Sequence, residues 1–401
     1  MQRKVAPFVL LQLASLTSVI SGSMVFIAIP WLALELTGSA GTAGFVVAMT
    51  AIPALLMAPI IGSIIDRFGR RFVAIWAELF TALTVILIPI VEGIWGLAVA
   101  SLIAVGVFRA VFAPGGSTSR KSLVPDTAAP ANMTLDRANS IHEGLFATGF
   151  AIGPALATLL IAQIGSANTF YVVALFGVLS SVFATFIRVH EQHEENDETE
   201  KEPFFKYALQ GFKVLAQNPG VMVMMAAVMT LAIIYLPTEM VVLPAYYNLL
   251  GDPEGLGLAI SVGAGASIIG ALGFEQIHKR LPFANILRIA ILGIGLAMIP
   301  MSQLPSQFWM VFFFGVLGLA WGPLLPLLNT VIQQKIPANK RGRVFALEMT
   351  IWQAGPLLTM VAVGLAVDGF GVGPVYMVLA AGVVLAGLLV SFNKYIKQLN
   401  S

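Results

Sequence analysis

The sequence predicts an all-α membrane protein in which twelve transmembrane helices form two pseudo-symmetric six-helix bundles. Three observations predict this fold class: the composition, the number of long apolar stretches and the positions of the basic residues. Of the 401 residues, 58% are hydrophobic and 10% are charged, whereas about 25% of the residues in an average soluble domain are charged. A soluble chain of this size needs far more polar surface to cover its core. The same numbers exclude a disordered chain, a collagen and a coiled coil.

Twelve stretches of the chain are long and apolar enough to cross a bilayer as helices. A helix needs roughly 20 apolar residues to cross the ~30 Å hydrocarbon core. The stretches lack the period-two alternation of a membrane β-barrel, which favours helices. The first is too long for the core of a signal peptide, so we interpret it as a retained span. The predicted spans cover residues 6–35, 41–65, 72–92, 95–118, 137–163, 167–188, 220–249, 256–276, 283–302, 307–332, 344–366 and 372–393.

The basic residues predict an even number of spans with both termini in the cytoplasm. Cytoplasmic loops of membrane proteins carry an excess of Lys and Arg. All but one of the 22 Lys and Arg residues fall on one side of the predicted spans, and the loops on the other side contain none. The exception is Arg109, inside the fourth span. We therefore expect a multi-pass protein of the bacterial inner (plasma) membrane.

A polar break divides the spans into six plus six. The acidic run 190–202 is typical of a solvated linker. After Pro203, apolar residues recur at helical spacing, which predicts a short interfacial helix. We expect an N-terminal bundle at 1–189, a cytoplasmic linker at 190–218 and a C-terminal bundle at 219–401.

Three short patterns recur about 200 residues later in the chain, as a duplication of a six-span unit predicts. Each match is short, but the three occur in the same order in both halves. They pair Gly153-Pro154 with Gly355-Pro356, Asp66 with Glu275, and Val124-Pro125 with Ile336-Pro337.

The loop between the second and third spans carries the most specific motif. A small glycine allows close helix approach, an acid can cap the next helix, and a second glycine permits a tight turn. The pattern resembles the cytoplasmic G-x-L-x-D-R-x-G-R-R signature of the major facilitator superfamily, and the resemblance implies a gating motif that stabilises one transport state. Its residues are Gly62, Asp66, Arg67, Gly69, Arg70 and Arg71.

A second pattern, Gly149-Phe-Ala-Ile-Gly153-Pro154, lies in the fifth span. Small residues four apart favour close helix packing, and a proline permits bending. The pattern resembles the g-x-x-x-G-P-x-x-G-G motif of exporters in that superfamily, although Ala157-Thr158 replaces the final glycine pair. The resemblance implies export.

Arg109 matches the arginine of the superfamily's R-x-x-q-G motif in span four, with Phe112 and Ala113 in place of Gln and Gly. A charge inside a membrane requires an aqueous cavity or an opposite charge. Arg109 lies ~15 Å inside the cytoplasmic end, and Glu78 and Glu143 lie ~10 Å inside the ends of their spans. Either carboxylate is within reach of Arg109, so we predict that all three take part in proton coupling, or alternatively form a structural ion pair.

Glu239 is the strongest predicted site for a proton or for a cationic substrate. It lies near the midplane of the seventh span, between Pro237 and Pro244, which loosen the helix. Desolvation favours the protonated form of a carboxyl, which lets it exchange protons. By contrast, Glu348 lies five residues after Arg343, which predicts a salt bridge near the cytoplasmic end.

Aromatic, methionine and a few amide side chains are predicted to line an adaptable apolar cavity, although packing against lipid or other helices also explains them. Scarce hydrogen-bonding groups favour a lipophilic or amphipathic substrate over a sugar. The predicted substrate-binding residues are Glu239, Tyr235, Phe112, Trp321, Asn329, Trp352, Gln353 and Met229.

The superfamily resemblance implies a secondary transporter, similar to bacterial drug, macrolide and siderophore exporters, that works by alternating access and proton antiport. The alternatives are an uncoupled facilitator or lysolipid carrier, and a non-transporting membrane sensor. We expect no enzymatic activity and no catalytic residue, because the chain has no H-E-x-x-H and no Walker A motif. We also expect no cofactor, no metal site and no nucleic-acid partner. The expected partners are a small-molecule substrate and the bilayer, with the chain acting as a monomer.

Overall fold

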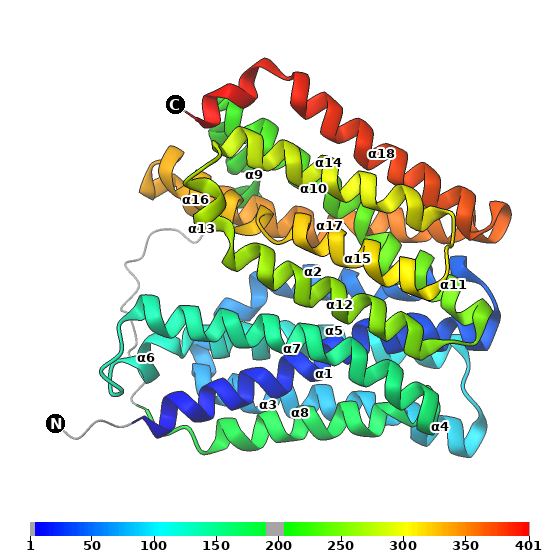
Figure 1. Cartoon of the computed structure of the whole chain (residues 1–401). Coiled ribbons are helices and arrows are strands. Elements are labelled where there is room, and N and C mark those ends of the chain that lie inside the picture. The colour runs from blue at the N-terminus through cyan, green and yellow to red at the C-terminus, as the bar shows by residue number, and fades with distance from the viewer. Residues whose placement is uncertain (1–4, 190–203, 401) are drawn as a thin grey trace. The chain divides into compact units, whose positions relative to one another are not determined.

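The structure is a computed structural model that describes residues 5–189 and 204–400. Every regular element among the described residues is a helix (Figure 1). Ten helices are long and apolar enough to cross a membrane, and the shorter apolar helices Thr169–Thr185 and Thr359–Phe370 bring the number to twelve. The predicted all-α membrane fold is thereby confirmed. Within the helices, the description leaves out the side chains of residues 58, 59, 62, 63, 66, 135, 136, 204–209, 338, 339, 342, 346, 349, 353 and 356–358.

The chain divides into two compact units. Unit 1 comprises residues 1–38 and 49–201, and unit 2 comprises residues 39–48 and 202–401. The division near residue 201 falls inside the predicted linker, of which residues 190–203 lie outside the description. The helix Ala40–Phe68 contributes to both units, because its residues up to 48 belong to unit 2 and the rest belong to unit 1.

Unit 1 contains the first six spans. In it α1 packs against α7 and α8, and α3 packs against α5 and α8. A buried apolar core near one end joins Phe8 and Leu11 of α1 to Leu123 and Ile187. The helices are α1 (Ala6–Thr37), α2 (Ala40–Phe68), α3 (Arg70–Val85), α4 (Leu87–Trp95), α5 (Val99–Ser122), α6 (Val124–Ala128), α7 (Leu135–Ile164) and α8 (Thr169–Thr185).

Unit 2 contains the last six spans and the short helix expected after Pro203. α12 packs against α15, α14 against α18, and α10 and α9 against α17. The helices are α9 (Phe204–Ala216), α10 (Pro219–Pro237), η1 (Thr238–Val242), α11 (Leu243–Leu250), α12 (Pro253–Leu272), α13 (Phe274–His278), α14 (Phe283–Ser302), α15 (Gln307–Trp321), α16 (Leu324–Lys335), α17 (Ala338–Phe370), α18 (Val372–Phe392) and η2 (Lys394–Leu399).

Besides the seventh span, whose helix changes geometry at Thr238–Val242, two predicted spans are interrupted helices. The third span divides at Ile86 into α3 and α4, and the tenth divides at Gly322-Pro323 into α15 and α16. Proline lacks the N–H that a helix needs for its i→i−4 bond. Pro89 therefore cannot bond to the carbonyl of Val85, and Pro323 has the same effect in the tenth span. Apolar content predicts the length of a span, but these local breaks depend on single prolines.

The first turn of α2 belongs to unit 2 because α17 holds it. The Asp368 carboxylate accepts hydrogen bonds from the Ser39 hydroxyl at 2.6 Å, from the Ala40 N–H at 2.7 Å and from the Gly41 N–H at 2.9 Å. A carboxylate at a helix N-terminus satisfies donors that have no partner inside the helix and complements the helix dipole. Asp368 thus caps α2.

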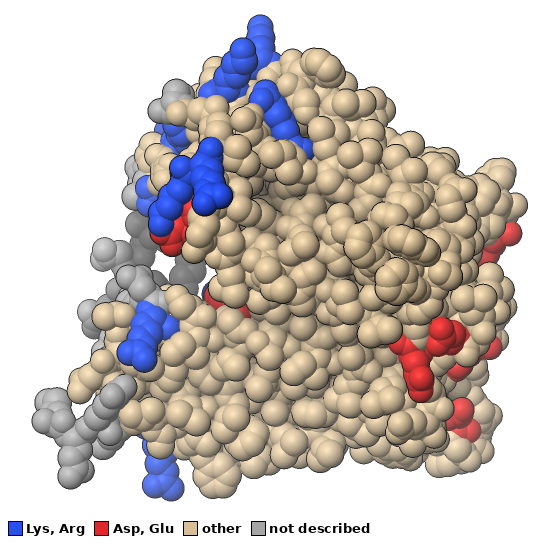
Figure 2. All heavy atoms as spheres, in the orientation of Figure 1, with Lys and Arg blue, Asp and Glu red and all other residues tan. Residues whose placement is uncertain are grey.

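The charges of each unit separate toward its two ends (Figure 2). In unit 1, exposed Arg67 and Arg137 lie near one end, and exposed Glu35 and Glu92 lie near the other. On the face that Figure 2 shows, the surface between the ends of each unit carries almost no charged side chain. Such a wide uncharged band fits contact with acyl chains rather than with water.

Candidate functional site

The seventh span changes its helical geometry at Glu239. α10 ends at Pro237, and the next five residues, Thr238–Val242, form a π-helical turn. The missing N–H groups of Pro237 and Pro244 leave earlier carbonyls without their usual partners, which loosens the helix on both sides. π-helical turns are rare and occur frequently at functional sites. Glu239 is half-buried on this turn.

Glu239 forms a cluster with three aromatic side chains of unit 2. The Tyr235 hydroxyl, one turn earlier, donates to Oε1 of Glu239 at 2.5 Å. The ring centroids of Tyr235 and Trp321 on α15 are 4.9 Å apart, and those of Trp321 and Trp352 on α17 are 6.2 Å apart. Among the described residues, no cationic side chain pairs with Glu239. We call these four residues the carboxylate–aromatic cluster.

Tyr376 on α18 is a neighbour of this cluster that the sequence did not indicate. It is fully buried and lies close enough to Glu239 and Tyr235 to interact with both electrostatically. Its hydroxyl donates to Sδ of Met301 at 3.5 Å. A single tyrosine in an apolar span is the only sequence signal, and tyrosines at membrane interfaces give the same signal.

The other predicted substrate-binding residues do not join the cluster through any contact the structure describes. Met229 is buried in α10, and Asn329 is exposed on α16. Phe112 lies in unit 1, where its ring packs 5.1 Å from that of Phe80. The side chain of Gln353 lies outside the described residues.

Arg109 is an ionisable side chain without a partner among the described residues. No hydrogen bond or ion pair involves it there, and its Nε is buried. Gly22 of α1 lies beside it, because a Cβ there would lie 3.6 Å from a terminal nitrogen of the guanidinium. Glu78 acts on Arg109 only through its electrostatic field. A partnerless guanidinium inside a span is costly, so it fits a function better than a packing role.

The two carboxylates that the sequence placed near Arg109 pair with other residues. Glu78 is 4% exposed and accepts from Arg120 at 2.5 Å and from the Ser18 hydroxyl at 2.8 Å. Glu143 accepts from Lys121 at 2.8 Å, and both of these side chains are exposed. The expected pairing of Arg109 with Glu78 or Glu143 is therefore wrong for this structure. Gly116 leaves the space for the Arg120–Glu78 pair, because a Cβ there would lie 2.6 Å from Oε1 of Glu78.

The described part of the predicted gating motif ties α3 to the neighbouring helices of unit 1. Arg70 pairs with Asp126 at 2.9 Å, and Arg71 donates to the carbonyl of Thr185 at 2.5 Å. Gly69 precedes α3 with φ of 88°, a left-handed conformation that only glycine adopts easily. Arg67 lies 5.5 Å from the ring of Phe68. The side chain of Asp66 and the surroundings of Gly62 are not described.

The glycines of the predicted helix-packing motif face α1. A Cβ on Gly149 would lie 2.9 Å from Cγ1 of Val19, and one on Gly153 would collide with the side chain of Ser23. The Ser23 hydroxyl donates to the carbonyl of Gly149 at 3.1 Å. Pro154 is buried beside these contacts. Only glycine permits α1 and α7 to approach this closely.

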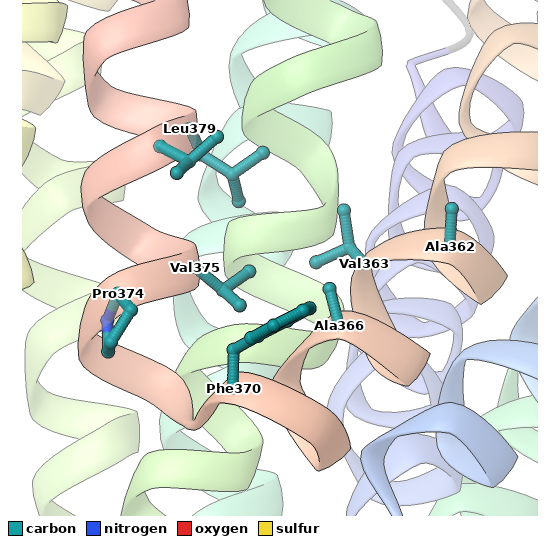
Figure 3. A pocket seen from close by; sticks show the side chains of 8 residues that line it. Ala362, Val363, Ala366, Phe370, Pro374, Val375 and Leu379 are labelled. Carbon is teal, nitrogen blue, oxygen red and sulfur yellow. The ribbon is translucent and has the colours of Figure 1, made fainter.

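An apolar cavity of about 490 Å³ lies between α17 and α18 (Figure 3). It contains no polar side chain that would orient a ligand, and none of the cluster residues lines it. Among the described residues, His, Asp and Glu side chains form no group suited to a metal ion. The lining residues are Ala362, Val363, Ala366, Phe370, Pro374, Val375, Val378 and Leu379.

Two bacterial efflux pumps resemble the chain along most of its length. It is 28% identical over 404 residues to the multidrug efflux pump Tap of Mycolicibacterium fortuitum, covering 99% of this chain and 98% of that protein. It is 30% identical over 389 residues to the multidrug efflux pump Tap of Mycobacterium tuberculosis, covering 96% and 92%. These matches support the resemblance to drug exporters that the motifs indicated.

The fold has a close relative among solved structures. A single-substitution mutant of the nucleoside transporter NupG superposes with a TM-score of 0.81 at 13% identity, covering 96% of this chain and all of that chain. The sequence model of the Major Facilitator Superfamily matches residues 11–360. Because that model covers most of the chain and the fold agrees, this multi-pass membrane protein belongs to the major facilitator superfamily of transporters.

Proposed function

We propose that the chain exports an amphipathic or lipophilic small molecule by alternating access, and that inward movement of protons drives export. The carboxylate–aromatic cluster is the observation that carries this proposal. The names of the two efflux-pump relatives support the direction and the substrate class. The same proposal places the protein in the bacterial plasma membrane with both termini in the cytoplasm.

The cluster has the chemistry of a site that exchanges a proton for a substrate. Glu239 has one hydrogen-bond donor, Tyr235, and no cationic partner among the described residues. A proton or the charged group of a substrate can therefore neutralise it. The rings of Tyr235, Trp321 and Trp352 offer apolar contact and cation–π attraction to an amphipathic molecule. The apolar spans that carry these residues contain few hydrogen-bonding side chains, so the site suits a ligand that forms few hydrogen bonds.

The remaining site residues take supporting roles in this proposal. Arg109 provides a positive charge inside unit 1 that responds when a membrane carboxyl takes up a proton. Glu78 holds Arg120 in place, and Glu143 holds Lys121 in place. The gating motif stabilises one transport state, and the α1–α7 contact at Gly149 and Gly153 keeps unit 1 rigid. Phe112, Asn329, Gln353 and Met229 are proposed to contact substrate in other states of the transport cycle.

Flux in proteoliposomes tests the proposal. Purified chain is reconstituted, a fluorescent amphipathic drug is added, and its movement is followed with and without a pH gradient. We expect accumulation against the drug's own gradient only when a pH gradient is present. Simple equilibration, with no effect of pH, would instead indicate an uncoupled facilitator or lysolipid carrier. Absence of any flux would favour the non-transporting sensor.

A further inference from the structure

Glu348 is a second buried carboxylate of unit 2, and it lacks the salt bridge that the sequence predicted. It is 9% exposed on α17, and its side chain is hydrogen-bonded to Trp352, one turn later. Among the described residues, Glu348 has no ion pair. An unneutralised carboxylate in a span is costly and is functional by default. Within the described part of the chain, no cation neutralises this acid.

Glu348 and Glu239 lie at opposite ends of one row of side chains. The row runs from Glu239 through Tyr235, Trp321 and Trp352 to Glu348, with each member in contact with the next. Its members come from η1, α10, α15 and α17, all of unit 2. Three electron-rich rings thus connect two acids.

The two acids lie at different depths. Glu239 is ~16 Å from the end of α11 at Leu250, and Glu348 is ~33 Å from the end of α17 at Phe370, counting 1.5 Å per residue. Both of these helix ends lie at the same side of unit 2, because the seventh and eleventh spans run in the same direction. Glu348 therefore lies ~17 Å farther toward the basic end of the unit.

We propose that Glu348 is a second anionic binding site, which takes the positively charged group of an amphipathic cation at the basic end of the aromatic row. This inference rests on the proposed export function and adds a specificity-determining residue to it. Glu348 attracts the cation, and the rings of Trp352, Trp321 and Tyr235 contact its apolar body on the path to Glu239. Two carboxylates joined by aromatic rings favour cations over anions of the same shape.

Binding of two ions of matched shape tests this proposal. Tetraphenylphosphonium is a lipophilic cation, and tetraphenylborate is an anion of nearly the same size and shape. Equilibrium dialysis of the full chain in detergent, corrected with empty micelles, gives an affinity for each. We expect Glu348→Gln to weaken binding of the cation about tenfold and to leave binding of the anion unchanged, because a charge-assisted contact is lost.

A second variant separates the loss of the negative charge of Glu348 from the loss of its hydrogen bond with Trp352. The amide of Glu348→Gln can still accept from the Trp352 indole, so a merely structural Glu348 tolerates the change. Trp352→Phe removes the indole donor and keeps both the acid and a ring. We expect Trp352→Phe to weaken both probe ions to a similar degree. Only Glu348→Gln changes the ratio of cation affinity to anion affinity.

Three results would overturn the proposal. They are a cation affinity of Glu348→Gln within twofold of the wild type, an equal loss for both ions in that variant, and no binding of the cation to the wild type above the micelle background. The export function is judged separately, because pH-driven flux of an uncharged drug does not depend on Glu348. If that flux persists when the cation result is negative, only the role of Glu348 is lost.

Discussion

The buried Arg120–Glu78 pair shows how two opposite charges can be placed inside unit 1 at low cost. The side chains of Arg120 and Glu78 are 4% and 6% exposed, and the Ser18 hydroxyl bridges them by donating to Glu78 and accepting from Arg120. Each charge is matched and hydrogen-bonded, which is the condition for burying an ion pair without a large penalty. Removing one partner leaves an uncompensated charge.

Glu78→Gln is therefore expected to lower the free energy of unfolding by about 3 kcal/mol or more, because it leaves Arg120 buried without a counter-charge. The matched control is Glu143→Gln, which breaks the exposed pair with Lys121 and is expected to cost less than about 1 kcal/mol. Thermal unfolding in detergent compares the two variants. Equal unfolding midpoints would show that the Arg120–Glu78 pair contributes little.

At the scale of whole helices, the packing of α7 on α1 depends on glycines. The same helix carries a glycine inside the contact, Gly153, and one outside it, Gly144, where a Cβ would meet nothing within 4 Å. Gly144 therefore serves as a comparison for Gly153 on the same helix. A stripe of small residues matters only where a partner helix approaches it.

We expect Gly153→Val to destabilise unit 1 by about 1–3 kcal/mol, because the side chain must push α1 away. Gly144→Ala is expected to be neutral or slightly stabilising, since alanine favours helix by about 1 kcal/mol over glycine. The amount of folded protein that survives detergent extraction and mild heating measures the difference. If Gly153→Val survives as well as Gly144→Ala, the close contact is not required.

The sequence predicts the positions of the helices better than it predicts which side chains pair with one another. Hydropathy is a local property, so the twelve spans, the charge distribution and the glycine patterns are all visible in the chain. The partner of Glu78 is not, because Arg109 and Arg120 lie about three turns apart on one face of α5 and only tertiary packing selects between them. The π-helical turn at Glu239 and the burial of Tyr376 are missed for the same reason. Prolines indicate that a helix is loosened there, but not in which way.

For the whole molecule, the separation of charges predicts the orientation in the membrane. By the positive-inside rule, we expect the basic end of each unit to be retained in the cytoplasm and the acidic end to face outward. The chain contains no cysteine, so single introduced cysteines report their own side without background. Glu92 is exposed near the acidic end of unit 1, and Lys397 is exposed near the basic end of unit 2.

In intact cells, a membrane-impermeant maleimide is expected to label Glu92→Cys and to leave Lys397→Cys unlabelled until the membrane is permeabilised. The two variants control for each other, because both positions are exposed. The reverse labelling pattern would place both termini outside. Labelling of both variants in intact cells would place both positions outside and imply an even number of membrane crossings between them.

The central claim is that Glu239 exchanges a proton for substrate. Glu275→Gln is a suitable control, because Glu275 is exposed and its hydrogen bond and ion pair with Lys279 at 2.6 Å hold its pKa below the ordinary value. Glu275 therefore stays ionised near neutral pH and cannot release a proton when substrate binds. Any proton released under those conditions comes from another group.

The most direct measurement is proton release from the detergent-solubilised chain when a saturating amphipathic drug is added in weakly buffered solution. A pH-sensitive dye records the change. We predict that the wild type and Glu275→Gln release a proton upon binding, and that Glu239→Gln binds the drug and releases none. Equal release from Glu239→Gln and the wild type would contradict the assignment of Glu239, and no release from the wild type would contradict proton exchange itself.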